Sequence, residues 1–321
     1  MQFSLDEVCI LPSSKVTDIN SRSEVDPYIN GKLPIFVSPM TCIIDENNFD
    51  IFKASKAEPI WPRKNKPDYD PFCHTNDWIA VSLKELENCN YNLNGMKILV
   101  DTANGHMKKL YDVVRTIKEK NPEVTIMVGN IAHPEIYQEC CMAGVDYVRV
   151  SCGTGSVCGT SVKTGIHASM QWLLSEISKI KSRLGTSATT KIIADGGLNI
   201  SRSIKALALG ADYVMLGREF AQCKEACGPL REKYPNSVGY PERLYYGMAS
   251  SRGKKDLGSS QNNIEGTETW LPVNTTLDKF LTEFEEALRS AMSYTGSHNL
   301  EEFKHVQTDI QTISEFKAYN K

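Results

Sequence analysis

The chain has 321 residues, of which 41% are hydrophobic and 23% charged, and its formal net charge is −3 at pH 7. This composition is ordinary for a globular protein with ample material for a core, and the nearly balanced charge gives no electrostatic footprint for nucleic acid. The length exceeds that of a usual single domain, yet α/β barrels run to about 250 residues or more as one domain.

The first residues, Met1–Glu7, carry neither a basic region nor an apolar run, so we expect no signal peptide. No stretch of the sequence approaches the ~20 apolar residues that a membrane helix needs. The ten cysteines are scattered without a C-x-x-C pair, which argues against a zinc site and against a disulfide framework. We therefore expect a cytoplasmic protein with reduced thiols and no membrane partner.

Short β-branched runs alternate with longer helix-like stretches along the chain. We expect eight strands, at Pro34–Ser38, Ala57–Trp61, Trp78–Ser82, Lys97–Asp101, Thr125–Gly129, Tyr147–Val150, Lys191–Ala194 and Tyr213–Leu216. Several of them lack polar alternation, which is typical of strands covered on both faces. Helical patterns lie between and after them, at Met107–Lys120, Pro134–Ala143, Ser169–Leu184, Ser201–Leu209 and Leu277–Ser290.

Local signals mark the ends of these helices. Pro134 suits a first helical turn, Gly144 suits a C-terminal cap, and either Asn199 or Ser201 suits an N-terminal cap. The segment Ser250–Gly266 is rich in Ser, Gly, Lys and Asn and has no apolar periodicity. Because long loops are often functional, we interpret it as a mobile flap, with a plain surface excursion as the alternative.

Eight strands with crossover helices predict an α/β fold, the (β/α)8 TIM barrel. We expect one barrel domain over residues 1–321, without inserted regulatory domains and with a flap around residues 250–266. A doubly wound open sheet is the alternative, and it is disfavoured because no G-x-G-x-x-G opens a helix after the first strand.

Barrel enzymes build their sites from the loops at the carboxyl ends of the strands. Here those loops begin with Ser38–Thr41, Asp101–His106, Gly129-Asn130, Ser151–Thr160, Asp195–Gly197 and Gly217-Arg218. Each loop alone could be a cap or a turn, but together they predict one polar rim. Asp195 is suited to ribose hydroxyls, and the glycines offer backbone N–H groups to a phosphate. Arg218 adds a positive charge for that phosphate, unless it is a solvated surface arginine.

The Ser151–Thr160 loop places Cys158 two residues before the hydroxyl of Thr160. Its glycines allow the backbone to approach a ligand closely. A cysteine held there is a nucleophile if its pKa is lowered. From these residues alone, a β–α turn with a half-buried thiol is an equally good interpretation.

These motifs resemble those of the IMP dehydrogenase/GMP reductase family. The matching segments are Asp101–His106, Gly129-Asn130, Gly153–Thr160, Ile193–Gly197, Val214–Gly217, Tyr246–Ser251, Glu265-Gly266 and Ser290–Gly296. They follow one another in order over nearly the whole chain. The resemblance implies a (β/α)8 barrel that assembles as a homotetramer.

The resemblance also implies roles for individual residues. Cys158 would attack C2 of a purine nucleotide, with Thr160 and Glu265 handling protons. The nucleotide would be held by Met40, Ser156, Asp195, Gly196, Gly197, Gly217, Arg218, Tyr245, Gly247, Met248 and Ala249. The nicotinamide cofactor would face Asp101, Asn104, Asn130, Gly153, Ser250 and Ser251. Relatives often hold a potassium ion on backbone carbonyls that correspond to those of Gly153, Gly155 and Cys158.

Within this family the chain looks more like the reductase branch. The dehydrogenases activate water with an Arg-Tyr pair on a long flap, whereas Arg252-Gly253 is followed here by no tyrosine. No regulatory insertion fits between Trp61 and Trp78, and Lys163–Gly165 also resembles the reductases. The resemblance thus implies NADPH-dependent reductive deamination of GMP to IMP and ammonia through a covalent Cys158 adduct.

The chain departs from the family pattern at several positions. Ile60–Lys64 stands where reductases have a His-Lys pair, and Asn262 where they have a cofactor-contacting arginine; Thr41, Ser151, Thr154 and Arg218 also differ. These departures leave alternatives open. They are a divergent IMP dehydrogenase, a reductase of another 2- or 6-substituted purine nucleotide, and a purine nucleotide-binding homologue without turnover.

Overall fold

The computed structural model describes residues 3–64, 69–74, 76–151, 155, 159–232, 239–258, 266–304 and 306–311. Its centre is an eight-stranded parallel sheet in the order β2-β9-β8-β7-β6-β5-β4-β3. The strands are β2 Ile35–Val37, β3 Ile60–Trp61, β4 Trp78–Val81, β5 Lys97–Asp101, β6 Thr125–Ile131, β7 Tyr147–Val150, β8 Lys191–Asp195 and β9 Tyr213–Leu216. The predicted strands are therefore confirmed to within a few residues at their ends.

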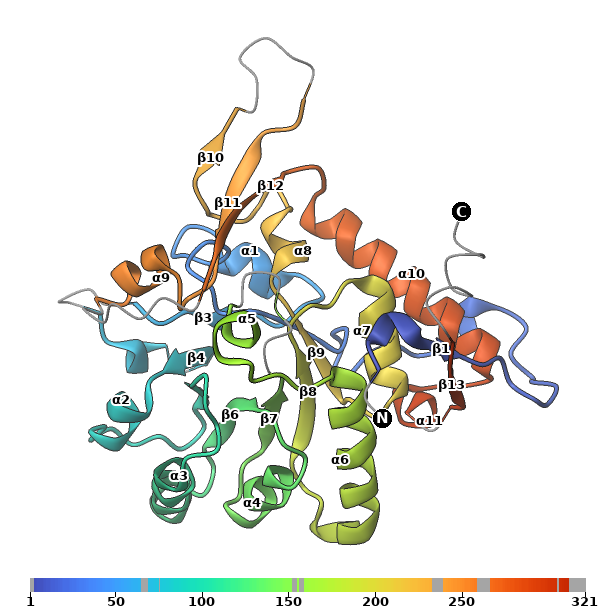
Figure 1. Cartoon of the computed structure of the whole chain (residues 1–321), viewed down its shortest axis with the longest axis horizontal. Coiled ribbons are helices and arrows are strands. Elements are labelled where there is room, and N and C mark those ends of the chain that lie inside the picture. The colour runs from blue at the N-terminus through green and yellow to red at the C-terminus, as the bar shows by residue number, and fades with distance from the viewer. Residues whose placement is uncertain are drawn as a thin grey trace.

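Glu58, just before β3, closes the sheet against β2. Its N–H donates to the carbonyl of Ile35, and its carbonyl accepts from the N–H of Val37, both at 2.9 Å. Helices surround the sheet (Figure 1). Together these features confirm the (β/α)8 barrel.

The helices alternate with the strands along the chain. They are α1 Phe49–Ala54, α2 Leu83–Glu87, α3 Lys108–Lys120, α4 Ile136–Met142, α5 Thr160–Thr164, α6 Met170–Leu184, α7 Ile200–Ala208, α8 Arg218–Ala221, α9 Ser251–Asp256, α10 Leu277–Thr295 and α11 Leu300–Phe303. Asn199, not Ser201, caps α7, because its side chain accepts from the N–H of Arg202 at 2.9 Å. Gly144 follows α4 with φ +75°, as expected for a C-terminal cap.

Apolar side chains fill both faces of the barrel wall. The inner cluster consists of Phe36, Ile60, Trp78, Ala80, Leu99, Met127, Ile193 and Met215. Phe36 packs edge-on against Trp78, with ring centroids 5.6 Å apart, so the barrel interior is a packed core. A larger cluster lies between the outer faces of the strands and the helices.

Two further small sheets complete the fold. β1 (Val8–Ile10) pairs with β13 (Thr308–Ile310), and β10 (Leu230–Arg231), β11 (Glu242–Tyr246) and β12 (Glu268–Pro272) form an antiparallel sheet. Figure 1 shows this second sheet projecting from one end of the barrel. In the segment that we expect to be a loop, residues 251–256 form α9, and residues 259–265 lie outside the described chain. The flap itself stays a prediction.

Two aspartates, one just before β7 and one just before β9, each accept a hydrogen bond from a backbone N–H of the preceding strand. The carboxylate of Asp146 accepts from the N–H of Ile126 at 2.7 Å and from Lys118 Nζ at 2.6 Å. The carboxylate of Asp212 accepts from the N–H of Ile192 at 2.7 Å. Asp146 and Asp212 both stand in the sequence Gly-X-Asp-Tyr-Val. The same short motif therefore links β6 to β7 and β8 to β9.

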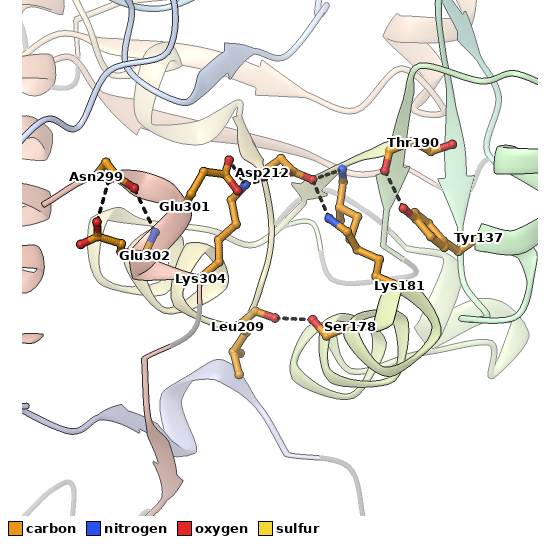
Figure 2. Close-up of polar contacts among 11 residues, drawn as sticks. Tyr137, Ser178, Lys181, Thr190, Leu209, Asp212, Asn299, Glu301, Glu302 and Lys304 are labelled. Atoms are coloured by element: carbon orange, nitrogen blue, oxygen red, sulfur yellow. Dashed lines mark hydrogen bonds and ion pairs between the residues drawn. The ribbon is translucent and has the colours of Figure 1, made fainter. Parts of the chain in front are cut away.

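Asp212 is the more deeply buried of these two aspartates. Lys304 Nζ lies 2.6 Å and Lys181 Nζ 3.4 Å from its carboxylate (Figure 2). Burial opposes ionisation of Asp212, but the two lysines outweigh it and hold the pKa of this carboxyl below its ordinary value. Lys304 is the C-cap of α11 and also pairs with Glu301 of that helix at 2.6 Å, so its bond to Asp212 ties α11 to the barrel.

Candidate active site

A cavity of about 930 Å³ opens at the carboxyl ends of the barrel strands. It is lined by loops that follow β2, β5, β6, β7, β8, β9 and β11. The predicted site residues on its wall are Met40, Asn104, Asn130, Gly155, Asp195, Gly196, Gly197, Gly217, Arg218, Tyr245, Gly247, Met248 and Ala249. The structure therefore gathers in one place most of the nucleotide-facing residues that the sequence indicates.

Asp195 is held on the cavity wall by partners from two neighbouring strands. Its Oδ2 accepts from Asn130 Nδ2 at 2.9 Å and lies 3.7 Å from Arg149 Nη1. Burial raises the pKa of Asp195, while the charge of Arg149 and the hydrogen bond from Asn130 oppose that shift. Its other carboxylate oxygen, Oδ1, can accept a hydrogen bond from a ligand hydroxyl.

Arg149 is a buried arginine that sequence reasoning missed. Its Nη2 donates to Asp101 Oδ1 at 2.6 Å and to the carbonyl of Gly129 at 2.8 Å. Arg149 thus connects Asp101, expected near the cofactor, with Asp195, expected near the ribose. Asp101 is described but does not line the cavity, because its carboxylate turns toward Arg149. In the sequence, the only indication of this role was that a charged residue occupies an inward-facing position of the otherwise apolar strand β7.

Glycines shape the end of the cavity that suits a phosphate. Gly196 and Gly197 have φ of +102° and +69°, a conformation that side chains rarely adopt, and they precede the capped N-terminus of α7. A Cβ on Gly217 would lie 2.8 Å from Tyr245 Oη and 3.1 Å from Met40 Sδ. The backbone there can approach a ligand closely, beside a helix end that favours anions.

Charged residues stand around this glycine-rich end. Arg202 Nη1 donates to the carbonyl of Gly197 at 2.8 Å, and the Arg202 guanidinium grips Asp6 with bonds of 2.8 and 2.6 Å. The hydrogen bond from Arg202 lowers the pKa of Asp6. Arg218 is exposed on the cavity wall next to Glu219, whose pKa is raised by burial. Sequence reasoning did not identify Asp6, Arg202 or Glu219, because only the fold brings them to the rim.

The segment after β11 forms a further part of the cavity wall. Gly247, Met248 and Ala249 line the cavity, and α9 packs directly behind them. The hydroxyl of Ser250 accepts from the N–H of Gly253 at 3.1 Å and so caps α9, while Ser251 is the first residue of that helix. Neither serine lines the cavity, so a cofactor contact by Ser250 or Ser251 stays a prediction.

The predicted catalytic residues fall largely outside the described chain. Gly153, Ser156, Cys158 and Glu265 belong to the undescribed segments, and for Thr160 only its position at the start of α5 is described. The described neighbours Ser151, Gly155, Thr164 and Ile166 line the cavity. The catalytic roles and the potassium-binding carbonyls therefore stay predictions.

Among the described residues, no group of three or more His, Cys, Asp or Glu side chains is placed to hold a metal ion. In the same part of the chain, every helix is too short or too polar to cross a membrane.

An eight-stranded barrel with a cavity at its carboxyl rim defines the class of (β/α)8 proteins that bind ligands at that rim. The chain belongs to the IMP dehydrogenase/GMP reductase family, since the IMP dehydrogenase / GMP reductase domain matches residues 91–318. It is 31% identical over 320 residues to the GMP reductase of Streptococcus agalactiae serotype V, with 95% of this chain and 93% of the relative covered. The GMP reductase of Streptococcus pyogenes serotype M49 is similar to the same extent. These matches confirm the resemblance seen in the sequence motifs.

Proposed function

We propose that this protein is a GMP reductase: an oxidoreductase that uses NADPH to convert GMP into IMP and ammonia. The observation that carries the proposal is the cavity at the carboxyl rim. It brings together Asp195, Gly197 and Gly217 beside the ends of the Cys158 loop, in a chain that is similar to GMP reductases over 95% of its length.

The cavity suggests how a purine nucleotide would lie. Its phosphate would sit on the backbone N–H groups of Gly196, Gly197 and Gly217, near the N-terminus of α7. Its ribose would be within reach of the Asp195 carboxylate. Its base would then face Met248, which also lines the cavity.

The side of the cavity formed by the β5 and β6 loops offers a place for a second ligand. Ala103, Asn104, His106, Asn130 and Ala132 line it and supply amide and imidazole groups beside small side chains. We propose that these residues hold the nicotinamide part of NADPH, which supplies a hydride when bound.

In the proposed covalent mechanism, Cys158, Thr160 and Glu265 each take part in one step. The Cys158 thiolate forms a bond to C2 of GMP, and the C2–amine bond breaks. Thr160 and Glu265 deliver the proton that the departing ammonia takes up. After a hydride reaches C2, the carbon–sulfur bond breaks, IMP leaves and the thiolate is regenerated.

A spectrophotometric assay tests the proposal. Purified protein should oxidise NADPH only when GMP is present, and Cys158→Ala should abolish this activity. Cys141→Ala, on α4 away from the cavity, is the matched control and should retain it. Failure of the wild-type protein to oxidise NADPH with GMP would contradict the proposal, and IMP-dependent reduction of NAD would point to a dehydrogenase instead.

A second candidate is a reductase of another 2- or 6-substituted purine nucleotide. Arg218 and Glu219 favour it, because both line the cavity at its phosphate end and Arg218 departs from the family pattern. A panel of purine nucleotides in the same assay distinguishes the two. The family also leads us to propose a cytoplasmic homotetramer that binds potassium, which light scattering and activity with and without potassium would test.

A further inference from the structure

Three side chains from separate segments meet behind the Met248 wall of the cavity. Thr41 follows β2, Tyr246 ends β11, and Asp256 ends α9. Thr41 Oγ1 donates to Asp256 Oδ2 at 2.7 Å, and Tyr246 Oη donates to the same oxygen at 2.8 Å. The two hydroxyl oxygens are themselves 3.2 Å apart. All of these contacts are partly buried, so the three residues form one closed hydrogen-bonded cluster, the Asp256 cluster.

Each arm of the Asp256 cluster is next to a residue of the cavity wall. Met40 precedes Thr41, Gly247–Ala249 follow Tyr246, and both segments line the cavity. Thr41 Oγ1 also lies 3.9 Å from Met248 Sδ, so Thr41 contacts the Met248 side chain while its proton is donated to Asp256. The cluster therefore joins two neighbouring segments of the cavity wall, those of Met40 and Met248.

Close backbone packing transmits the position of α9 to Met248. A Cβ on Gly253 would lie 2.5 Å from the carbonyl oxygen of Gly247 and 2.6 Å from Met248 Cα. Gly253 is thus in direct contact with the wall segment, on the same short helix as Asp256. A movement of α9 would shift Met248, because so little space separates the two backbones.

Two hydroxyl groups converge on one carboxylate oxygen of Asp256. Burial, together with the hydrogen bond to Asp256, raises the pKa of Tyr246, so this hydroxyl keeps its proton and acts as a donor. The guanidinium of Arg252 lies 5.7 Å from the centre of the Tyr246 ring and adds a cation–π contact on the side of α9. Removal of either hydroxyl or of the charge would leave a partly buried group without its partner.

We propose that Asp256, through Thr41 and Tyr246, is a positioning residue that fixes Met248 and thereby sets the affinity of the cavity for a purine base. The identity of the base rests on the proposed function. The positioning itself rests only on the contacts between α9, Thr41 and Tyr246.

A double-mutant cycle on the full chain tests the proposal. Thr41→Val and Asp256→Asn should each raise the KM for GMP about 10-fold, equivalent to about 1.4 kcal/mol, while kcat changes much less. The double variant should also lie about 10-fold above the wild type rather than ~100-fold, because both changes open the same cluster. Thr41→Ser keeps the hydroxyl and should behave like the wild type, as should the exposed control Asp50→Asn.

Hydrogen exchange provides a readout that does not depend on activity. Thr41→Val and Asp256→Asn should speed amide exchange in residues 247–257 and leave the barrel strands unchanged. If the wild type has no activity with GMP but the variants still show this local change, the proposed function fails and the positioning role stands. Additive effects on KM, or exchange in residues 247–257 that does not change, would overturn the positioning role. Tyr246→Phe, which retains the ring, should give the same local change if either other variant fails to fold.

Discussion

Asp212→Asn tests the buried cluster that fastens β8, β9 and α11. The substitution keeps the shape of the side chain and one acceptor for the N–H of Ile192, but it removes the charge that Lys304 faces at 2.6 Å. The side chains of Asp212 and Lys304 are each only 9% exposed, so the lysine loses its main partner in a site with little water. Breaking a buried pair costs about 3–5 kcal/mol. Because Lys304 retains Glu301, we expect about 3 kcal/mol, the lower end of that range.

The matched variant is Asp146→Asn, which removes the charge from the equivalent aspartate before β7, where the side chain is more exposed. The Asp146 side chain is 38% exposed and its pair with Lys118 is screened by water, so we expect a loss of about 1 kcal/mol or less. Thermal unfolding followed by circular dichroism should show a midpoint roughly 5 °C lower for Asp212→Asn and ~1 °C lower for Asp146→Asn. Equal shifts for the two variants would refute the argument from burial.

Proton linkage gives this prediction a second test. The pKa of Asp212 lies below its ordinary value in the folded chain, so its ionisation stabilises the fold above the unfolded pKa of about 3.9. This contribution is lost as the pH falls through the folded pKa. The wild type should therefore lose more stability than Asp212→Asn when the pH is lowered through about 4 toward 2, and parallel curves for the two proteins would contradict the assignment.

Three further substitutions probe the site. Gly217→Ala should push Tyr245 and Met40 into the cavity and weaken nucleotide binding about 10-fold by calorimetry, with little change in stability, since the new Cβ would meet only side-chain ends. Asp195→Asn should raise the unfolding temperature at neutral pH while weakening nucleotide binding, because burial raises the pKa of Asp195 and its ionisation then opposes folding; a lower unfolding temperature would contradict this sign. Asn199→Ala removes the cap of α7 and should cost about 1 kcal/mol in urea unfolding, and an unchanged midpoint would show that the cap contributes nothing.

The barrel could be predicted from the sequence because each strand is a short apolar run with turn residues at both ends. The sheet of β10, β11 and β12 could not, since β11 begins with Glu242 and Arg243, which look like surface residues. In the structure Arg243 is buried and donates to carbonyls of Ala221, Lys224 and Gly228. These carbonyl acceptors belong to the end of α8 and the loop after it, and they surround Arg243 only once the chain has folded. The sequence around Arg243 therefore contains no hydrophobic periodicity that would predict its burial.

Some residues of the candidate site could likewise be predicted from the sequence, and others could not. Asp195, Gly197 and Gly217 could be predicted because they follow strands directly, and a barrel brings all strand ends to one rim. Arg149 could not, because its partners Asp101 and Asp195 come from other strands. The helix α9 was missed because its short length gives no apolar period, and its start depends on the Ser250 cap.

The contact between Asp6 and Arg202 has a practical consequence for handling the protein. Arg202 holds the carbonyl of Gly197 on the cavity wall, and its guanidinium is steadied by Asp6, close to the start of the chain. An affinity tag fused ahead of Asp6, or a shortened N-terminus, would therefore act on the nucleotide end of the cavity. Binding measurements should be made on protein whose first residues are unmodified, with any tag removed before the assay.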